Sequence, residues 1–220
     1  MLRTLTDEVR FSGVAWAWSR EPRNIHIVTD WNIVDGSQLY VKDDSKVPTA
    51  ICYGPKGITW GYGIPAEENA IKWFKLLLLR ENDLEDDVRK SKFLKTARSH
   101  IERIGKDPVD VVADFLRLLW QKTLTSMERV CSKSGVEGLP FKVVLTVPAI
   151  WKPYARVKMQ DAAKRAGILE SRLCGKTTLQ LVSEPEAAAL ATLHEWPGRG
   201  TIKARYSLVC FAALTVDTGR

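Results

Sequence analysis

One stretch of the sequence limits the fold more than any other. It is the nearly continuous run of β-branched and other apolar residues from Phe141 to Val147, which Pro148 ends. Apolar residues at successive positions are typical of a strand covered on both faces, and proline cannot continue the ladder of a central strand. An amphipathic helix between Tyr154 and Gly167 and a second short apolar run, Leu179 to Val182, follow. This order predicts an α/β fold with a parallel sheet.

A long helix is predicted before this unit. Asp107-Pro108 places a cap residue before proline at the first helical position, and apolar residues then recur at spacings of three and four. We expect the helix to continue to about Ser132. Two glycines are expected to end it, Gly135 and Gly138.

Another helix is predicted to begin after the second apolar run. Ser183 and Glu186 have the spacing of a capping box, and Pro185 lies in the first turn. The alanines that follow keep this helix thin, so that another backbone or a ligand can approach it closely. A last strand is expected to start at Tyr206 to Cys210.

The N-terminal half is predicted to be rich in strands. Two hairpins are expected, and each is built from two segments with strand patterns: 11–19 with 25–31, and 46–53 with 58–62. The first connection is Glu21-Pro22-Arg23-Asn24, and the second is Gly54-Pro55-Lys56-Gly57, where proline fixes φ and glycine permits a positive φ. Asn69 to Arg80 is predicted to be helical, and the charged stretch Glu81 to Lys92 to be a surface connection or the start of a solvated helix.

Composition excludes several classes of protein. The 220 residues are 45% hydrophobic, which provides enough apolar surface for one large or two small domains. No run of about eighteen uncharged apolar residues occurs, so no membrane-spanning helix is expected. Met1 to Arg10 lacks the apolar core of a secretory signal, which favours the cytoplasm or the nucleus. The four cysteines form no C-x-x-C pair, so neither a zinc site nor a redox motif is predicted.

The positive charge is concentrated in one part of the chain. The net charge is +7, and residues 142–176 hold eight basic residues against only Asp161 and Glu170. Nucleic acid is therefore a candidate partner. These charges fall on the outer face of one predicted helix without interleaved aromatic residues, so a solvated face explains them better.

Three blocks of the sequence carry a resemblance to a known family. They are Val143-Val144-Leu145-Thr146-Val147-Pro148-Ala149, Asp161-Ala162-Ala163-Lys164-Arg165-Ala166-Gly167 and Ser183-Glu184-Pro185-Glu186-Ala187-Ala188-Ala189. Their order and spacing resemble those of the seventy-kilodalton heat-shock (DnaK-type) chaperones, and the segments near Phe11, Val47 and Lys72 look like a divergent branch of that family. The likeness spans about residues 11 to 210.

The resemblance implies a ribonuclease-H-like, actin-like ATPase lobe with a mixed sheet and flanking helices. In this family two lobes close over ATP and Mg²⁺. Residues 1–35 together with 107–196 would form the sheet subdomain of lobe one, and residues 36–106 a smaller inserted subdomain. Residues 197–220 would be the start of lobe two, so that the chain is expected to be truncated.

The same resemblance implies two glycine hairpins that hold the phosphates, and both are altered here. The first should read Asp-x-Gly-Thr-Thr immediately before Phe11, but residues 6–10 are Thr-Asp-Glu-Val-Arg, so only Ser12 and Gly13 are kept as cofactor-binding candidates. The second should follow Cys210, where the chain reads Phe-Ala-Ala-Leu-Thr; Asp217 and Gly219 are the candidates for a displaced, incomplete hairpin. Tight binding of ATP and Mg²⁺ is therefore not expected.

One catalytic candidate remains. Glu184 matches the family glutamate that reaches the water shell of magnesium and helps to position the attacking water. Its alternative role is to compensate the dipole of the helix that it begins. The family lysine that contacts the transferred phosphate has no clear counterpart near Trp60 to Gly63, and Lys72 and Lys75 are interpreted as the polar face of a helix. No metal-binding residues are predicted.

Three functional hypotheses follow from the sequence. The first is a nucleotide-binding lobe of a heat-shock chaperone-like, actin-fold ATPase that cannot bind or hydrolyse ATP alone. The second is a non-catalytic module that binds a co-chaperone or another protein. The third is an active ATPase in a longer chain that restores both hairpins.

Overall fold

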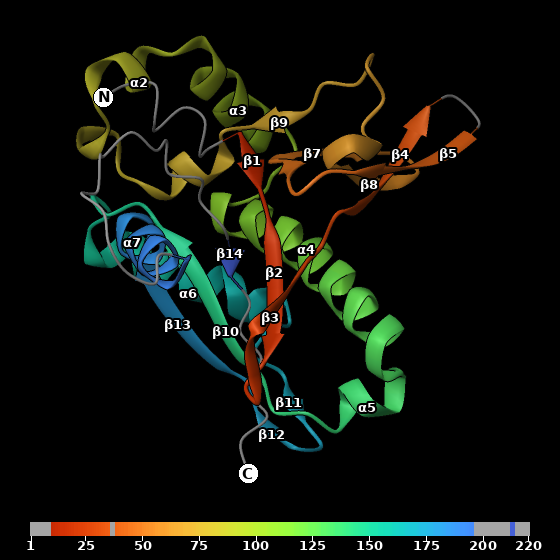
Figure 1. Ribbon diagram of the computed structural model, residues 1–220. Helices are drawn as coiled ribbons and strands as arrows, with labels where there is room; N and C mark the ends of the chain where they lie inside the picture. Colours follow the sequence, from red (N-terminus) through yellow and green to blue (C-terminus); the bar gives the residue numbers. More distant parts are fainter. Residues whose placement is uncertain (1–9, 36–37, 196–211, 214–220) are drawn as a thin grey trace.

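The computed structural model describes residues 10–35, 38–195 and 212–213 and has a mixed α/β architecture (Figure 1). The long helix α4 (Pro108–Cys131) runs through its centre. Strands β7 and β8 and helices α2 and α3 lie beyond its N-terminal half, and strands β10 and β13 lie on the side of α6 and α7 (Figure 1). The predicted α/β class is confirmed.

The two apolar runs form parallel strands. β10 (Lys142–Val147) pairs with β13 (Thr178–Ser183) in continuous register from Lys142↔Thr178 to Val147↔Ser183. In β10, Val143, Leu145 and Val147 are buried on one face and Thr146 on the other. The expected strand with two covered faces is therefore present.

Helix α6 (Pro153–Arg165) makes the crossover between these strands and packs on α4. Ala155, Met159 and Ala162 are buried along one face, as the amphipathic pattern predicts. Gly167 follows with a φ of +83°, the left-handed conformation that glycine adopts without a steric penalty.

The start of α4 confirms the predicted cap. The Oδ1 atom of Asp107 accepts a hydrogen bond from the backbone N–H of Val109 at 2.7 Å. The Oδ2 atom of Asp110 accepts one from the backbone N–H of Asp107 at 3.3 Å, which completes a capping box. The predicted end near Ser132 is confirmed, because α4 ends at Cys131, but the two glycines do not end this helix. Ser132 adopts a φ of 66° and breaks the helix before Gly135, which lies inside the short helix α5 (Lys133–Glu137).

The first predicted hairpin exists, but its turn lies earlier in the sequence. β2 (Val14–Trp18) and β3 (Glu21–Ile27) are antiparallel, so the expected connection around Pro22 belongs to β3 instead. Proline lacks the N–H that a ladder needs and is tolerated because β3, in the described sheet, pairs only with β2. The next two strands form a separate hairpin, β4 (Asp30–Asp35) and β5 (Gln38–Asp43).

The second predicted hairpin is confirmed as β7 (Ala50–Gly54) and β8 (Gly57–Trp60). The predicted helix over residues 69–80 was wrong. This segment forms β9 (Ile71–Lys72), which pairs with β7, and then the 3₁₀ helix η2 (Phe74–Leu78). Its four consecutive leucines are buried, so packing on all sides, rather than one apolar helix face, determines its conformation.

Shorter elements complete the described chain. Helices η3 (Glu81–Asp83) and α2 (Asp86–Lys90) form the predicted charged surface connection. The others are β1 (Phe11–Ser12), β6 (Val47–Pro48), η1 (Gly61–Gly63), α3 (Lys92–Arg103), β11 (Ser171–Arg172), β12 (Gly175–Lys176), α7 (Glu184–Glu195) and β14 (Ala212–Ala213). The strand expected at Tyr206 to Cys210 lies outside the described residues.

Aromatic side chains connect the parts of the core. Trp31 contacts Trp60 edge-on, Trp60 contacts Phe115 of α4, and Phe115 contacts Phe74, with ring centroids 5.5 to 6.0 Å apart. These separations suit favourable aromatic pairs. Within the part of the chain described, no helix is long and apolar enough to cross a membrane.

Candidate functional site

Glu184 is buried at the junction of β13 and α7. It is the first residue of the helix, directly after the strand, and its side chain is only 3% exposed. A carboxylate at a helix N-terminus is favoured by the helix dipole. The position therefore holds a negative charge away from water, which requires a partner.

Lys75 of η2 supplies that partner. Its Nζ atom donates to Oε1 of Glu184 at 3.2 Å, and its side chain is 19% exposed. The same Nζ atom lies 5.6 Å from the centroid of the Trp151 ring, which follows β10. The ammonium group is thus held between a carboxylate and an aromatic face, both of which stabilise a cation.

A small cavity lies beside Lys75. Its volume is about 70 Å³, and its polar atoms come from Lys75, Ser12, Thr49 and Thr146. The Ser12 and Thr49 hydroxyl groups are hydrogen bonded to each other at 2.8 Å, across the pairing of β1 with β6. The remaining walls are apolar side chains: Phe11, Phe74, Val112, Phe115, Leu116, Leu119, Leu145 and Met159.

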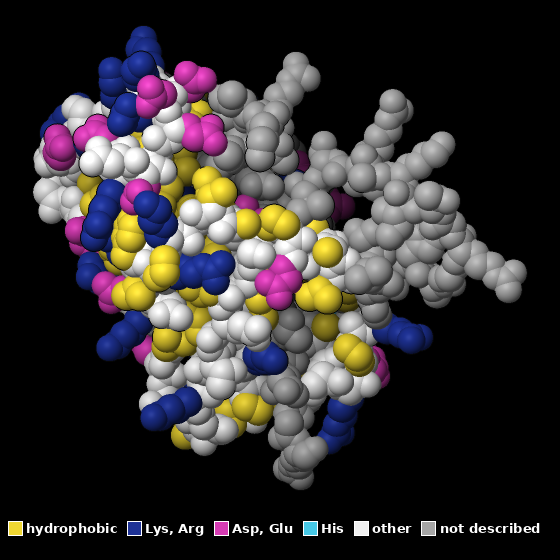
Figure 2. Space-filling view, turned by 90° about the vertical axis from the view of Figure 1, so that its left-hand side faces the viewer, with side chains coloured by type: hydrophobic (Ala, Val, Ile, Leu, Met, Phe, Trp, Pro, Cys, Tyr) yellow, Lys and Arg dark blue, Asp and Glu magenta, His cyan; other side chains and the backbone are white. Residues whose placement is uncertain are grey.

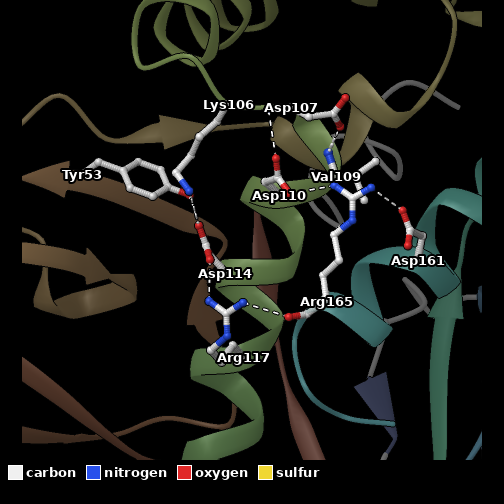
Figure 3. A network of polar contacts seen from close by, with 9 residues as sticks. All are labelled: Tyr53, Lys106, Asp107, Val109, Asp110, Asp114, Arg117, Asp161 and Arg165. Carbon is white, nitrogen blue, oxygen red and sulfur yellow. Dashed lines mark hydrogen bonds and ion pairs between the residues drawn. The ribbon is translucent and has the colours of Figure 1, made fainter. Parts of the chain in front are cut away.

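A polar cluster around the buried Asp114 holds α4 in place (Figure 3). Residues of α4 also line the cavity. Asp114 accepts hydrogen bonds from the Tyr53 hydroxyl at 2.9 Å, from Lys106 Nζ at 2.9 Å and from Arg117 Nη1 at 2.5 Å. Burial alone would raise the pKa of Asp114, but these hydrogen bonds outweigh it and hold the pKa below its usual value. The cluster ties β7 and the start of α4 together.

The cluster continues to α6. Arg117 Nη2 donates to the backbone carbonyl of Arg165 at 2.9 Å, and the Arg165 guanidinium pairs with Asp110 and Asp161 (Figure 3). These pairs are about half exposed and contribute little individually. Together they fix the crossover helix against α4.

The Lys75–Glu184 pair determines what this site can do. Two opposite charges that satisfy each other leave no net charge for a ligand, and breaking such a buried pair by removing one partner typically costs about 3 to 5 kcal/mol. Lys75 and Glu184 also lie 109 positions apart in the sequence. The contact therefore connects η2 to the β13–α7 junction as a structural link.

The cavity beside Lys75 is small for a nucleotide. A site for a small molecule usually has a volume of about 300 to 1,000 Å³, and the cavity beside Lys75 has about 70 Å³. Gly13 is buried between β1 and β2. The described part of the chain contains no group of three or more His, Cys, Asp or Glu residues placed to hold a metal ion.

The structure brings some of the candidate residues near one another. Ser12 lines the cavity together with Lys75, which contacts Glu184. Asp217 and Gly219 lie outside the described residues. The interpretation of Lys75 as part of a polar helix face was wrong, because Lys75 belongs to a 3₁₀ helix and points into the protein, whereas Lys72 is exposed as expected. No local spacing signal links Lys75 to Glu184.

Comparison with known proteins points to one family, although no protein-family model matches the chain. The chain is similar to human heat shock 70 kDa protein 12B, with 28% identity over 221 aligned residues that cover 90% of this chain and 30% of that protein. Mouse heat shock 70 kDa protein 12A is 27% identical over 192 residues, covering 81% and 26%. The chaperone protein HscA of Serratia proteamaculans is 38% identical over 85 residues, covering 39% and 11%.

These similarities and the mixed α/β architecture are compatible with a lobe of the actin-like ATPase class. The chain is a divergent relative of the seventy-kilodalton heat-shock proteins, and the predicted resemblance is confirmed. It spans 30% or less of the length of these relatives.

Proposed function

We propose that the chain is the first lobe of a chaperone-type nucleotide-binding domain with a ribonuclease-H-like fold, and that it does not bind or hydrolyse ATP by itself. ATP and Mg²⁺ are the cofactors that the family resemblance implies. The observation that carries the proposal is the Lys75–Glu184 pair. The glutamate that would act on the magnesium water shell instead pairs with the partly buried Lys75.

The sequence of the two phosphate hairpins supports the same conclusion. In the family, glycine allows backbone N–H groups to approach the phosphates closely. Here Glu8 stands at a glycine position of the first hairpin, and alanines replace the glycines of the second. A side chain and a negative charge at the first position oppose phosphate binding.

The proposed organisation has two subdomains in the lobe. Residues 1–35 and 107–196 form the sheet subdomain, residues 36–106 the inserted one, and residues 197–220 begin lobe two. Apolar and polar contacts join the two proposed subdomains. Trp60 and Phe74 pack against Phe115. The polar contacts are Lys75 with Glu184, Tyr53 with Asp114, and Asp83 with Lys152 and Tyr154. They support a lobe whose two parts are held together by specific pairs.

Isothermal titration calorimetry with MgATP tests the proposed function. We expect no binding heat at up to about 1 mM nucleotide for the natural chain, and none for the variant Lys72→Met, which changes an exposed lysine near the site. A dissociation constant in the micromolar range, about −8 kcal/mol, that is lost in Lys75→Met but kept in Lys72→Met would contradict the proposal.

Exposed apolar side chains favour a second candidate function, a module that binds a co-chaperone or another protein in the cytoplasm or nucleus. Ile150, Val157 and Leu190 are each about 60% exposed, in or next to α6 and α7. Figure 2 shows hydrophobic side chains at the surface between scattered lysines and arginines, without one continuous basic stripe. Exposed apolar surface of this kind is typical of protein contacts.

The solution behaviour of charged variants tests this second candidate. The double variant Val157→Lys, Leu190→Lys should reduce self-association in sedimentation velocity without changing the free energy of unfolding. Val130→Lys, an equally exposed apolar position on α4, is the matched control and should have no effect on self-association. Equal effects of both changes would show that these positions form no specific contact surface.

A further inference from the structure

A second cavity lies in the proposed inserted subdomain, between β7, the segment that leads into β9 and the end of α3. β7 and β9 are antiparallel, and β9 packs beside α3 (Figure 1). The pairing ends where Ile51 lies opposite Ile71, and the cavity opens beyond this pair. We call it the β7–α3 cavity, and the lining residues that matter for its chemistry are Cys52, Glu68, Ile71, His100, Arg103 and Ile104.

The size of the β7–α3 cavity suits a small metabolite. Its volume is about 270 Å³. An apolar cavity of about 150 Å³ is enough to hold benzene, whereas pockets for drug-sized ligands have about 300 to 1,000 Å³. The cavity therefore fits a molecule somewhat larger than benzene, of the size of a free amino acid.

Side chains of opposite charge line the cavity without pairing. Glu68 comes from the segment before β9, and Arg103 comes from the last turn of α3. Among the described residues, neither takes part in an ion pair, so the carboxylate and the guanidinium lie too far apart to neutralise each other. A molecule that carries both an ammonium group and a carboxylate can fill the gap with charge-assisted hydrogen bonds at both ends.

A second donor lies on the side of Arg103. His100 is three positions earlier in α3, so the two side chains share one face of the helix, and both line the cavity. A histidine ring carries at least one N–H group, and the guanidinium carries five. This wall is therefore rich in donors and suits a carboxylate, whereas the carboxylate of Glu68 suits an ammonium group.

The inner wall of the cavity is uncharged. Ile71 is 3% exposed and Cys52 is 8% exposed. Burial and the nearby Glu68 carboxylate raise the pKa of the Cys52 thiol to about 11, so the thiol is neutral at pH 7. An apolar group of a ligand is stabilised against this wall, whereas a charged group would lose its water there. The wall thus favours an amino acid with an apolar side chain over one with a charged side chain.

We propose that the β7–α3 cavity is a binding site for a free apolar amino acid. Glu68 accepts hydrogen bonds from the ammonium group of the ligand, Arg103 donates to its carboxylate, and its side chain packs against Ile71. The site involves neither Lys75 nor Glu184, so its failure would leave the proposed function unaffected.

Isothermal titration calorimetry on the natural chain tests the required charges. The probes are L-leucine and L-methionine, and we expect a dissociation constant of about 1 mM or tighter for each. Leucine amide lacks the carboxylate, N-acetylleucine lacks the ammonium group, and glycine lacks the apolar side chain. Each of these controls should bind at least tenfold more weakly than leucine. No binding of either probe at about 20 mM, or a control that binds as tightly as leucine, would overturn the proposal.

Two pairs of variants locate the site. Glu68→Gln and Arg103→Met should each weaken the binding of leucine at least tenfold, because each removes one of the two charges that hold the ligand. Glu67→Gln and Lys95→Met are the matched controls, since they change exposed charges of the same segments that do not line the cavity, and they should bind leucine like the natural chain. All four positions are exposed, and urea unfolding checks that each variant is folded. Unchanged binding in Glu68→Gln or Arg103→Met, or an equal loss in the controls, would overturn the assignment of the site.

Discussion

Replacement of Asp114 tests the polar cluster of Figure 3. Its carboxylate is 9% exposed and accepts hydrogen bonds from the Tyr53 hydroxyl, Lys106 and Arg117. Asp114→Asn keeps the shape and one acceptor oxygen but removes the charge. Asp114→Ala removes every acceptor and leaves the Tyr53 hydroxyl without its partner.

The expected loss follows from these contacts. A hydrogen bond to a charged group contributes about 1.5 to 3 kcal/mol, and an unsatisfied buried donor costs about 1 to 3 kcal/mol. Lys106 and Arg117 are 33% and 41% exposed, so water can solvate them again after the change. We therefore expect about 1.5 to 3 kcal/mol for Asp114→Asn and about 3 to 4 kcal/mol for Asp114→Ala.

Urea unfolding followed by tryptophan fluorescence measures these losses. Asp161→Asn is the matched control, because its exposed ion pair with Arg165 should contribute less than about 1 kcal/mol. A loss below about 0.5 kcal/mol for Asp114→Ala, or the same loss for Asp161→Asn, would refute the reasoning.

Three further changes have defined outcomes. The pKa of Asp114 is lowered on folding, so its carboxylate stabilises the folded state above the ordinary value near 3.8, and this stabilisation is lost as the pH falls further. The difference in the free energy of unfolding between the natural chain and Asp114→Asn should therefore shrink between pH 7 and pH 3. A constant difference in urea unfolding would contradict this. Gly167→Ala should destabilise the protein by about 1 kcal/mol in the same assay, because φ is +83° there, and an unchanged unfolding midpoint would argue against that conformation. The first hairpin can be restored by Thr6→Asp, Glu8→Gly, Val9→Thr and Arg10→Thr. We expect no ATP turnover from this variant, because hydrolysis also needs the second hairpin and a closed cleft. Steady turnover in a phosphate-release assay would show that one lobe is sufficient.

Local signals in the sequence predicted the elements that local physics controls. The Asp107 cap and the proline after it located the start of α4, and the apolar run up to Val147 located β10 and its parallel pairing. Gly167 marked the end of α6 because a left-handed residue is needed there. Each of these features depends on residues that are close in the sequence.

The failures involve contacts between distant residues. Segment 69–80 has a helical pattern, but Trp73 adopts a φ of 63° and the leucines after it are buried, so tertiary packing overrides the propensity for a regular helix. Lys75 was missed as part of the site because its partner Glu184 is 109 positions away and no spacing rule connects them. Glu184 itself could be identified from the motif around it, whereas its pairing could not.

A double-mutant cycle at Lys75 and Glu184, measured with and without MgATP, tests the central claim most directly. The variants are Lys75→Met, Glu184→Gln and both together, and urea unfolding gives the coupling free energy between the two side chains. We predict a favourable coupling of about 1.5 to 3 kcal/mol, because both groups are largely buried. We also predict that about 5 mM MgATP leaves the stability of the natural chain unchanged, since a ligand that binds only the folded state would raise it. A coupling near zero, or a clear stabilisation by MgATP that Glu184→Gln removes, would contradict the account.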